Sequence, residues 1–176
     1  MKKLFFLIGS FCLLHTYMNA QFFVMKVDGV TGESVRFKDK TELMGFVMEG
    51  SSSQSAAAGG GMAAGKRTYQ PATILKQTGA SSPILFQNFY AGKFIREISI
   101  EYYQTDSKAG KDILEYVITF RNVTINGYKQ FAGTVKNELF DIANNSMMCD
   151  EVKFNFQEIM LDYKKGNIIA QDNIMR

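Results

Sequence analysis

The sequence contains no tryptophan, one histidine, two cysteines and two prolines among 176 residues. Two prolines exclude an extended proline-rich stalk. Long apolar runs are also missing: the longest, LFFLIGSFCLL at 4–14, is far shorter than the ~20 residues of a membrane-spanning helix. We therefore expect no stable membrane insertion. With 46% hydrophobic and 21% charged residues, the chain can fill the core of one ordinary domain.

The first twenty residues have the layout of a secretory signal peptide. Lys2 and Lys3 precede the apolar run, and a short polar stretch ends at the small residue Ala20. Met18 departs from the pattern, because a small residue is usual three positions before the cut. This pattern predicts a leader at 1–20, a mature domain at 21–176 and a secreted protein. The alternatives are a buried N-terminal strand or helix, and translation from Met18, which would leave the protein cytoplasmic before export.

Removal of the leader would also remove His15 and Cys12. The mature chain then has no histidine for Ser–His, Cys–His or His–metal chemistry, and Cys149 has no partner for an intrachain disulfide. Loss of Lys2 and Lys3 leaves 18 basic against 17 acidic residues, a net charge of +1. Such a balance gives no electrostatic reason to bind nucleic acid. We expect no catalytic residues, no metal and no cofactor.

Cys149 is followed by two acids, Asp150 and Glu151. Their negative charge should raise the pKa of the thiol, which is the wrong direction for a nucleophile. On a strand the two acids point to opposite faces, so they cannot act as a catalytic pair. We expect Cys149 to be a spectator, and most acids of this chain to lie on the solvated rim.

Alternating apolar and polar residues predict a mostly β domain, a sandwich or barrel of two sheets. The clearest strands are REISIEYYQT at 96–105 and ILEYVITFRNVTI at 113–125. In EVKFNFQEIMLDY at 151–163, the apolar alternation slips by one residue after Phe156. A β-bulge near Gln157 and Glu158 would explain the slip.

One short helix is expected at about 82–91, in SSPILFQNFYAGK. Ser82 can cap it, Pro83 suits its first turn and Gly92 suits its end. Its apolar face contains one polar exception, Asn88.

The segment 50–66 is rich in Gly, Ala and Ser and has no periodic apolar face, which predicts a long exposed loop. Its end, GGGMAAGKR, has the glycine and lysine spacing of a phosphate-binding loop. However, Arg67 stands where such a loop needs Ser or Thr, and the following TYQPATI does not begin a helix. We therefore predict that this loop contacts other subunits, through Gly50, Ser51, Gly59, Gly60, Gly61, Met62, Gly65 and Lys66.

Several segments resemble, in order, the haemolysin-coregulated protein (Hcp) family of type VI secretion systems. FVMKVDGVTGES at 23–34 resembles the family's opening strand and turn. A Gly/Ser-rich loop ending in Gly-Lys follows, then a Ser-Pro helix closing with AGK at 91–93. Strands of the types ISIEYY, LEYVITFRNVTI and VKFNFQEIMLDY complete the resemblance, which covers 22–163. The segment 128–149 matches poorly.

The resemblance implies a small β-barrel with a flanking helix and no enzymatic activity. It implies hexameric rings that stack into a tube and carry effectors in the lumen. The expected partners are further copies of this chain, effectors and other type VI components, with the loop 50–66 at the subunit or ring interface. The leader departs from the family, whose tube subunits are loaded from the cytoplasm. The alternative is therefore a secreted Hcp-fold binding module or effector that builds no tube.

Overall fold

The computed structural model describes residues 21–52, 67–106, 109–133, 135–136, 140–142 and 147–174. The predicted leader and most of the predicted loop lie outside these residues. The elements, in chain order, are β1 (Gln21–Val27), β2 (Thr41–Val47), β3 (Gly50–Ser52), β4 (Arg67–Tyr69), β5 (Ala72–Gln77), α1 (Ser82–Tyr90), β6 (Phe94–Asp106), β7 (Lys111–Ala132), β8 (Val135–Lys136), β9 (Asp141–Ile142), β10 (Met148–Asn155), β11 (Glu158–Tyr163), the 3-10 helix η1 (Lys164–Gly166) and β12 (Ile168–Asn173).

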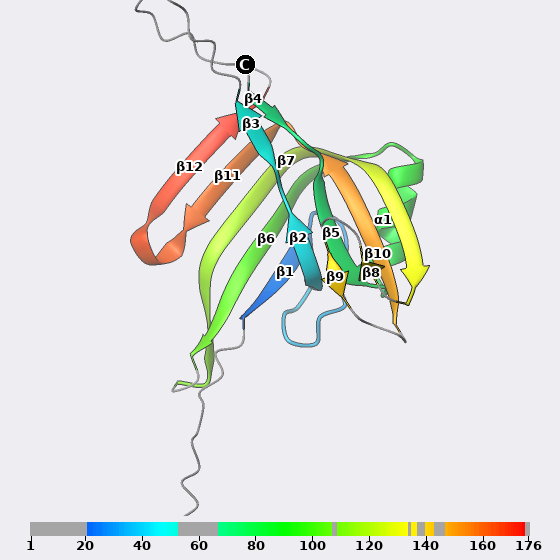
Figure 1. Ribbon diagram of the computed structural model, residues 1–176. Helices are drawn as coiled ribbons and strands as arrows, with labels where there is room; N and C mark the ends of the chain where they lie inside the picture. The colour runs from blue at the N-terminus through cyan, green and yellow to red at the C-terminus, as the bar shows by residue number, and fades with distance from the viewer. Residues whose placement is uncertain are drawn as a thin grey trace, which may run out of the picture.

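The main sheet closes into a barrel (Figure 1). Its strand order is β10-β5-β2-β1-β6-β7-β11-β12, and a further pairing between β10 and β7 joins the ends of six of these strands. The hairpin of β11 and β12 continues the sheet beyond the barrel. The predicted mostly β fold with one flanking helix is therefore confirmed, as a barrel rather than two separate sheets.

β7 makes the closure possible because it is 22 residues long and serves two partners on one side. Tyr116 to Arg121 pair with β11, whereas Thr124 to Ala132 pair with β10. Between these stretches Asn122 adopts a positive φ of 52°. An asparagine tolerates this left-handed conformation better than most residues, so it suits the point where the strand changes partner.

The segment 151–163, expected to be one strand with a bulge near Gln157 and Glu158, forms two strands instead, although the slip in its alternation falls at the predicted place. β10 ends at Asn155 and β11 begins at Glu158. Between them the amide of Gln157 donates a hydrogen bond of 3.1 Å to the carbonyl oxygen of Arg121. The two-residue interruption, Phe156 and Gln157, changes the phase of the alternation, so that both Phe156 within it and Ile159 after it stay buried in the core.

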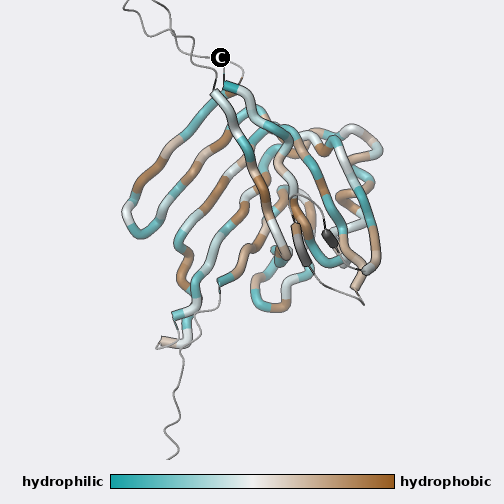
Figure 2. The backbone as a smooth tube through the Cα atoms, viewed as in Figure 1, coloured by the Kyte–Doolittle hydropathy of each residue, from teal (hydrophilic) through white to brown (hydrophobic). Residues whose placement is uncertain are grey.

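The barrel core consists mainly of aliphatic and phenylalanine side chains. Figure 2 shows hydrophobic and hydrophilic positions following one another along the strands. Phe120 is fully buried, and its ring centroid lies 4.7 Å from that of Phe156 and 5.2 Å from that of Phe154. Ile98 and Ile100, which alternate with polar residues on β6, are also buried. Burying each such side chain contributes about 1.5–3 kcal/mol.

The helix forms at the predicted place with a different start. α1 spans Ser82–Tyr90 with Ser81, not Ser82, at its N-cap, and Ser81 makes no side-chain capping hydrogen bond. The hydroxyl of Ser82 is instead engaged by Lys76 and Asp150 on the neighbouring strands. Gly92 has a φ of 58° and ends the helix as predicted. Among the described residues, no helix is both long and apolar enough to cross a membrane.

Candidate functional site

A short ribbon of β3 and β4 forms the two ends of the predicted assembly loop. Gly50 pairs with Tyr69, Ser51 with Thr68 and Ser52 with Arg67. A Cβ on Gly50 would lie only 2.9 Å from the ring of Tyr69, so the close packing of the two strands requires glycine here. Of the eight predicted loop residues, Gly50 and Ser51 lie in this ribbon, and the other six lie outside the described residues.

The ribbon is anchored to the edge strand β12 through Asp172. The guanidinium of Arg67 lies 2.6 Å from one oxygen of Asp172, and the hydroxyl of Tyr69 donates a hydrogen bond of 2.9 Å to the other. Burial of Tyr69, followed by its contact with Asp172, raises the pKa of the phenol. The ring of Tyr69 also packs on Phe156, 5.6 Å between centroids. These contacts fix the end of the loop to the barrel core.

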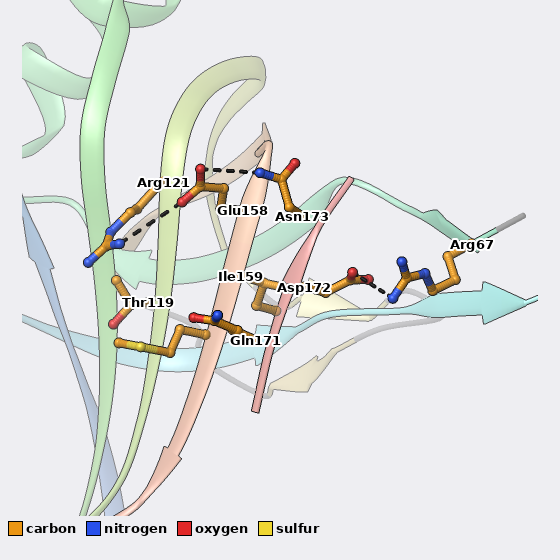
Figure 3. A pocket seen from close by; sticks show the side chains of 9 residues that line it. Arg67, Thr119, Arg121, Glu158, Ile159, Gln171, Asp172 and Asn173 are labelled. Carbon is orange, nitrogen blue, oxygen red and sulfur yellow. Dashed lines mark hydrogen bonds and ion pairs between the residues drawn. The ribbon is translucent and has the colours of Figure 1, made fainter. Parts of the chain in front are cut away.

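Beside this anchor lies a polar cavity of about 390 Å³ (Figure 3). Arg121 on β7 pairs with Glu97 at 3.2 Å and with Glu158 at 4.0 Å. Asn173 donates a hydrogen bond of 3.4 Å to Glu158. Both arginines that line the cavity, Arg67 and Arg121, already pair with carboxylates. The charges that line the cavity are thus largely paired with one another.

The strand that follows Lys66 supports the rejection of a phosphate-binding loop. Such a loop places its anion at the N-terminus of the helix that follows it. Here Arg67 begins β4, and the next helix starts only at Ser82, after a further strand. Among the described residues no group of three His, Cys, Asp or Glu side chains is arranged to hold a metal ion.

A buried ionic cluster joins the N-terminus of α1 to the barrel, and sequence reasoning missed it. Lys76 and Asp150 are both 0% exposed and lie 3.3 Å apart. Lys76 also pairs with Glu33 at 2.9 Å and donates a hydrogen bond of 2.9 Å to Ser82. One sequence feature could have revealed the cluster. Lys76 ends the mostly apolar run ATILK, and this position in a buried strand predicts that the lysine is buried too.

Both carboxylates of this cluster are held ionised. Burial raises the pKa of Asp150, but hydrogen bonds from Ser82, Gln130 and Thr78 and the charge of Lys76 outweigh burial and lower it below 3.8. For Glu33, burial is likewise outweighed by contacts with Lys76 and Ser81, which lower the pKa below 4.5. The expectation of a solvated rim thus fails for Asp150, because its partner lies on a strand 74 positions away.

Cys149 is buried and free of any disulfide. Burial, and secondarily the charge of Asp150, raises the pKa of its thiol. The predicted upward shift of the thiol pKa is confirmed, although burial contributes more to it than the neighbouring acid does. Its sulfur lies 3.7 Å from the sulfur of Met44, within a small second apolar cluster. This environment is that of a packed core residue.

The comparisons with known proteins agree with this architecture. The family model for the type VI secretion system effector Hcp matches residues 24–163.

This chain belongs to the Hcp family.

Solved structures share the fold at low sequence identity. Hcp1 from Salmonella typhimurium is 17% identical with a TM-score of 0.65, covering 89% of this chain and 96% of that one. Secreted protein Hcp3 from Pseudomonas aeruginosa is 15% identical with a TM-score of 0.62, covering 89% and 98%. Hcp1 from Flavobacterium johnsoniae is 10% identical with a TM-score of 0.54, covering 86% and 99%. No curated protein sequence matches the chain. The chain is thus a type VI secretion Hcp protein with a tube-protein β-barrel.

Proposed function

We propose that this Hcp protein is a tube subunit that forms hexameric rings, and that the rings stack and carry effectors in their lumen. The observation that carries the proposal is the anchored ribbon of β3 and β4, which extends from the end of the barrel beside β12 (Figure 1). Asp172 holds the ribbon to β12, so the loop 50–66 leaves the domain from a fixed position. A fixed origin lets a loop reach a defined patch on a neighbouring subunit.

The free edge of the sheet supports assembly. Six strands close on one another, whereas β12 ends the sheet order within the described part of the chain. Ile168 and Ile169 on β12 are 63% and 61% exposed. β12 also contains no lysine, arginine or proline, the residues that commonly protect a sheet edge from pairing. Exposed isoleucines on an edge strand without lysine or proline are typical of a strand that another chain covers.

An apolar row leads across the sheet to this edge. Paired positions on six adjacent strands carry, in order, Leu43, Phe23, Tyr102, Tyr116, Tyr163 and Ile168. Phe23 and Tyr163 remain exposed. Ring assembly needs two different complementary surfaces on each subunit. The edge with its apolar row provides one, and the ribbon with its loop provides the other.

Sedimentation of the purified protein, followed by electron microscopy, tests the proposal. We expect hexameric rings that dissociate when Ile169→Lys places a charge on the edge; because Ile169 pairs with Asp162, the monomer tolerates this lysine. The matched control Ile169→Val keeps the edge apolar and should keep the rings. Deletion of residues 53–65 should also abolish assembly. A strictly monomeric wild-type protein at high concentration would refute the tube proposal.

The predicted apolar leader favours one alternative, a secreted Hcp-fold binding module or effector that builds no tube. In that case the loop deletion leaves the oligomeric state unchanged. The N-terminal residue of the protein purified from cells separates the two routes of export. Gln21 indicates cleavage of a signal peptide, whereas Met18 indicates a cytoplasmic start. In either case we assign no catalytic role to this chain.

A further inference from the structure

A second cavity lies between the end of α1, the turn after β1 and the start of β6. It measures about 370 Å³ and is lined by Asn88 together with Asp28, Ile84, Lys93, Phe94 and Arg96. Asn88 lines this cavity and is 7% exposed. Among the described residues no fully buried side-chain nitrogen or oxygen lacks a hydrogen-bond partner, so the amide of Asn88 is not an orphaned buried group. It brings one acceptor oxygen and one donor nitrogen to the lining of the cavity.

The rim of this cavity carries cations that can be engaged. Lys93 is exposed, and its ammonium group has no ion-pair partner among the residues that the structure describes. Arg96 pairs with Asp28 at 3.1 Å, but the two side chains are 82% and 44% exposed. An exposed pair of this kind contributes about 0–1 kcal/mol, so it opens readily for a competing carboxylate. Two cations against one carboxylate leave the rim with a positive charge.

The mouth of the cavity also offers apolar contact. Phe94 is 66% exposed, directly after the helix-ending Gly92. Ile84 on α1 is half-buried, and Ile95 beside Phe94 is buried. A ligand that fits this cavity therefore combines a hydrogen-bonding group with one donor and one acceptor, a negative charge and a short aliphatic part.

We propose that this cavity binds an acidic, extended peptide segment of a partner protein. A main-chain amide of the segment exchanges hydrogen bonds with Asn88, and a glutamate or aspartate carboxylate binds Lys93 and Arg96. The aliphatic carbons of the segment lie against Phe94. The site shares no residue with the ribbon, the loop or the β12 edge, so the inference goes beyond ring assembly and does not depend on it.

The test uses the full chain as purified and a fluorescein-labelled, capped alanine hexapeptide with two central glutamates. Fluorescence anisotropy at low salt should show saturable binding. Replacing both glutamates by glutamines, or N-methylating the central peptide nitrogens, should weaken binding about tenfold in each case. These peptide changes need no protein variant, so they remain decisive if a variant folds poorly.

The protein variants locate the binding. Asn88→Leu removes the amide at similar volume, and we expect about tenfold weaker binding. Lys93→Glu and Arg96→Glu should each weaken binding at least about fivefold. The control Lys165→Glu changes the same charge on η1, in the hairpin that lies across the barrel from α1 (Figure 1), and should change nothing.

The inference is overturned by any of three results. These are no saturable binding up to about 10 mM peptide, equal binding of the glutamate and glutamine peptides, or equal loss with Lys165→Glu. Binding of a second copy of this chain in place of the peptide, sensitive to Asn88→Leu, would also overturn it, because the occupant would then be another Hcp subunit.

Discussion

The buried pair of Lys76 and Asp150 makes a strong prediction about stability. Asp150→Asn keeps the size of the side chain and removes its charge. Lys76, which has no exposed surface, then keeps only the partly exposed carboxylate of Glu33 at 2.9 Å as a counter-charge. Breaking a buried ion pair by removing one partner costs about 3–5 kcal/mol. Because Glu33 still offsets part of the charge of Lys76, we expect Asp150→Asn to lower the free energy of unfolding by about 3 kcal/mol, the lower end of this range.

Urea unfolding followed by circular dichroism measures this loss. With an m value of about 2 kcal/mol/M, the midpoint should fall by about 1.5 M. Protein concentration must be matched, because assembly adds to the apparent stability. The control Asp28→Asn removes a carboxylate from an exposed pair and should cost less than about 1 kcal/mol.

The pH dependence gives an independent check of the same pair. The folded state lowers the pKa of Asp150 and Glu33 below their ordinary values of 3.8 and 4.5. Their contribution to stability is thus fully present above the unfolded pKa values and is lost as the pH falls through the folded ones. Asp150→Asn should make the wild-type loss of stability on acidification shallower. The pair does not stabilise the fold if stability falls equally steeply with pH in the wild type and in Asp150→Asn, and if Asp150→Asn lowers the urea midpoint no more than Asp28→Asn does.

Three further predictions concern the ribbon, the core and the thiol. Tyr69→Phe removes the hydrogen bond to Asp172, and we expect a loss of about 1 kcal/mol with faster amide exchange in β3 and β4; unchanged exchange would contradict the anchoring role. Phe120→Ala should cost about 3–5 kcal/mol in urea unfolding because its fully buried ring contacts Phe154 and Phe156; a loss below about 1 kcal/mol would contradict its central place in the core. Cys149 should react with a thiol reagent only at the rate of unfolding, because burial protects it and raises its pKa; rapid reaction of the native protein at pH 7 would refute this.

Local patterns in the sequence predicted a large part of the fold. Alternation of apolar and polar residues predicted that Ile98 and Ile100 lie on the buried face of β6. Gly92 marked the end of α1. The slip of phase after Phe156 located the irregularity between β10 and β11, although a bulge within one strand was expected there. Each of these features depends on residues within a few positions of one another, so a single stretch of sequence contains the necessary information.

The sequence did not reveal how the segments meet. The poorly matching segment after Tyr128 hid the continuation of β7 to Ala132, where β10 closes the barrel. Ser82 was expected to cap the helix, but a lysine six residues before it and an aspartate 68 residues after it engage its hydroxyl. Asn88 was noticed as a polar exception on the helix, and only the tertiary structure shows the cavity that it lines.

The sequence by itself determined the mostly β character of the domain, its clearest strands and the place of the helix α1, because hydrophobic periodicity and turn residues act locally. Only the tertiary structure decided that Lys76, Asp150 and Glu33 share one buried site, that Asp172 holds the ribbon, and that β12 is left as the open edge. Those outcomes depend on strand order and register, since charges and edges far apart along the chain acquire partners only when the barrel closes.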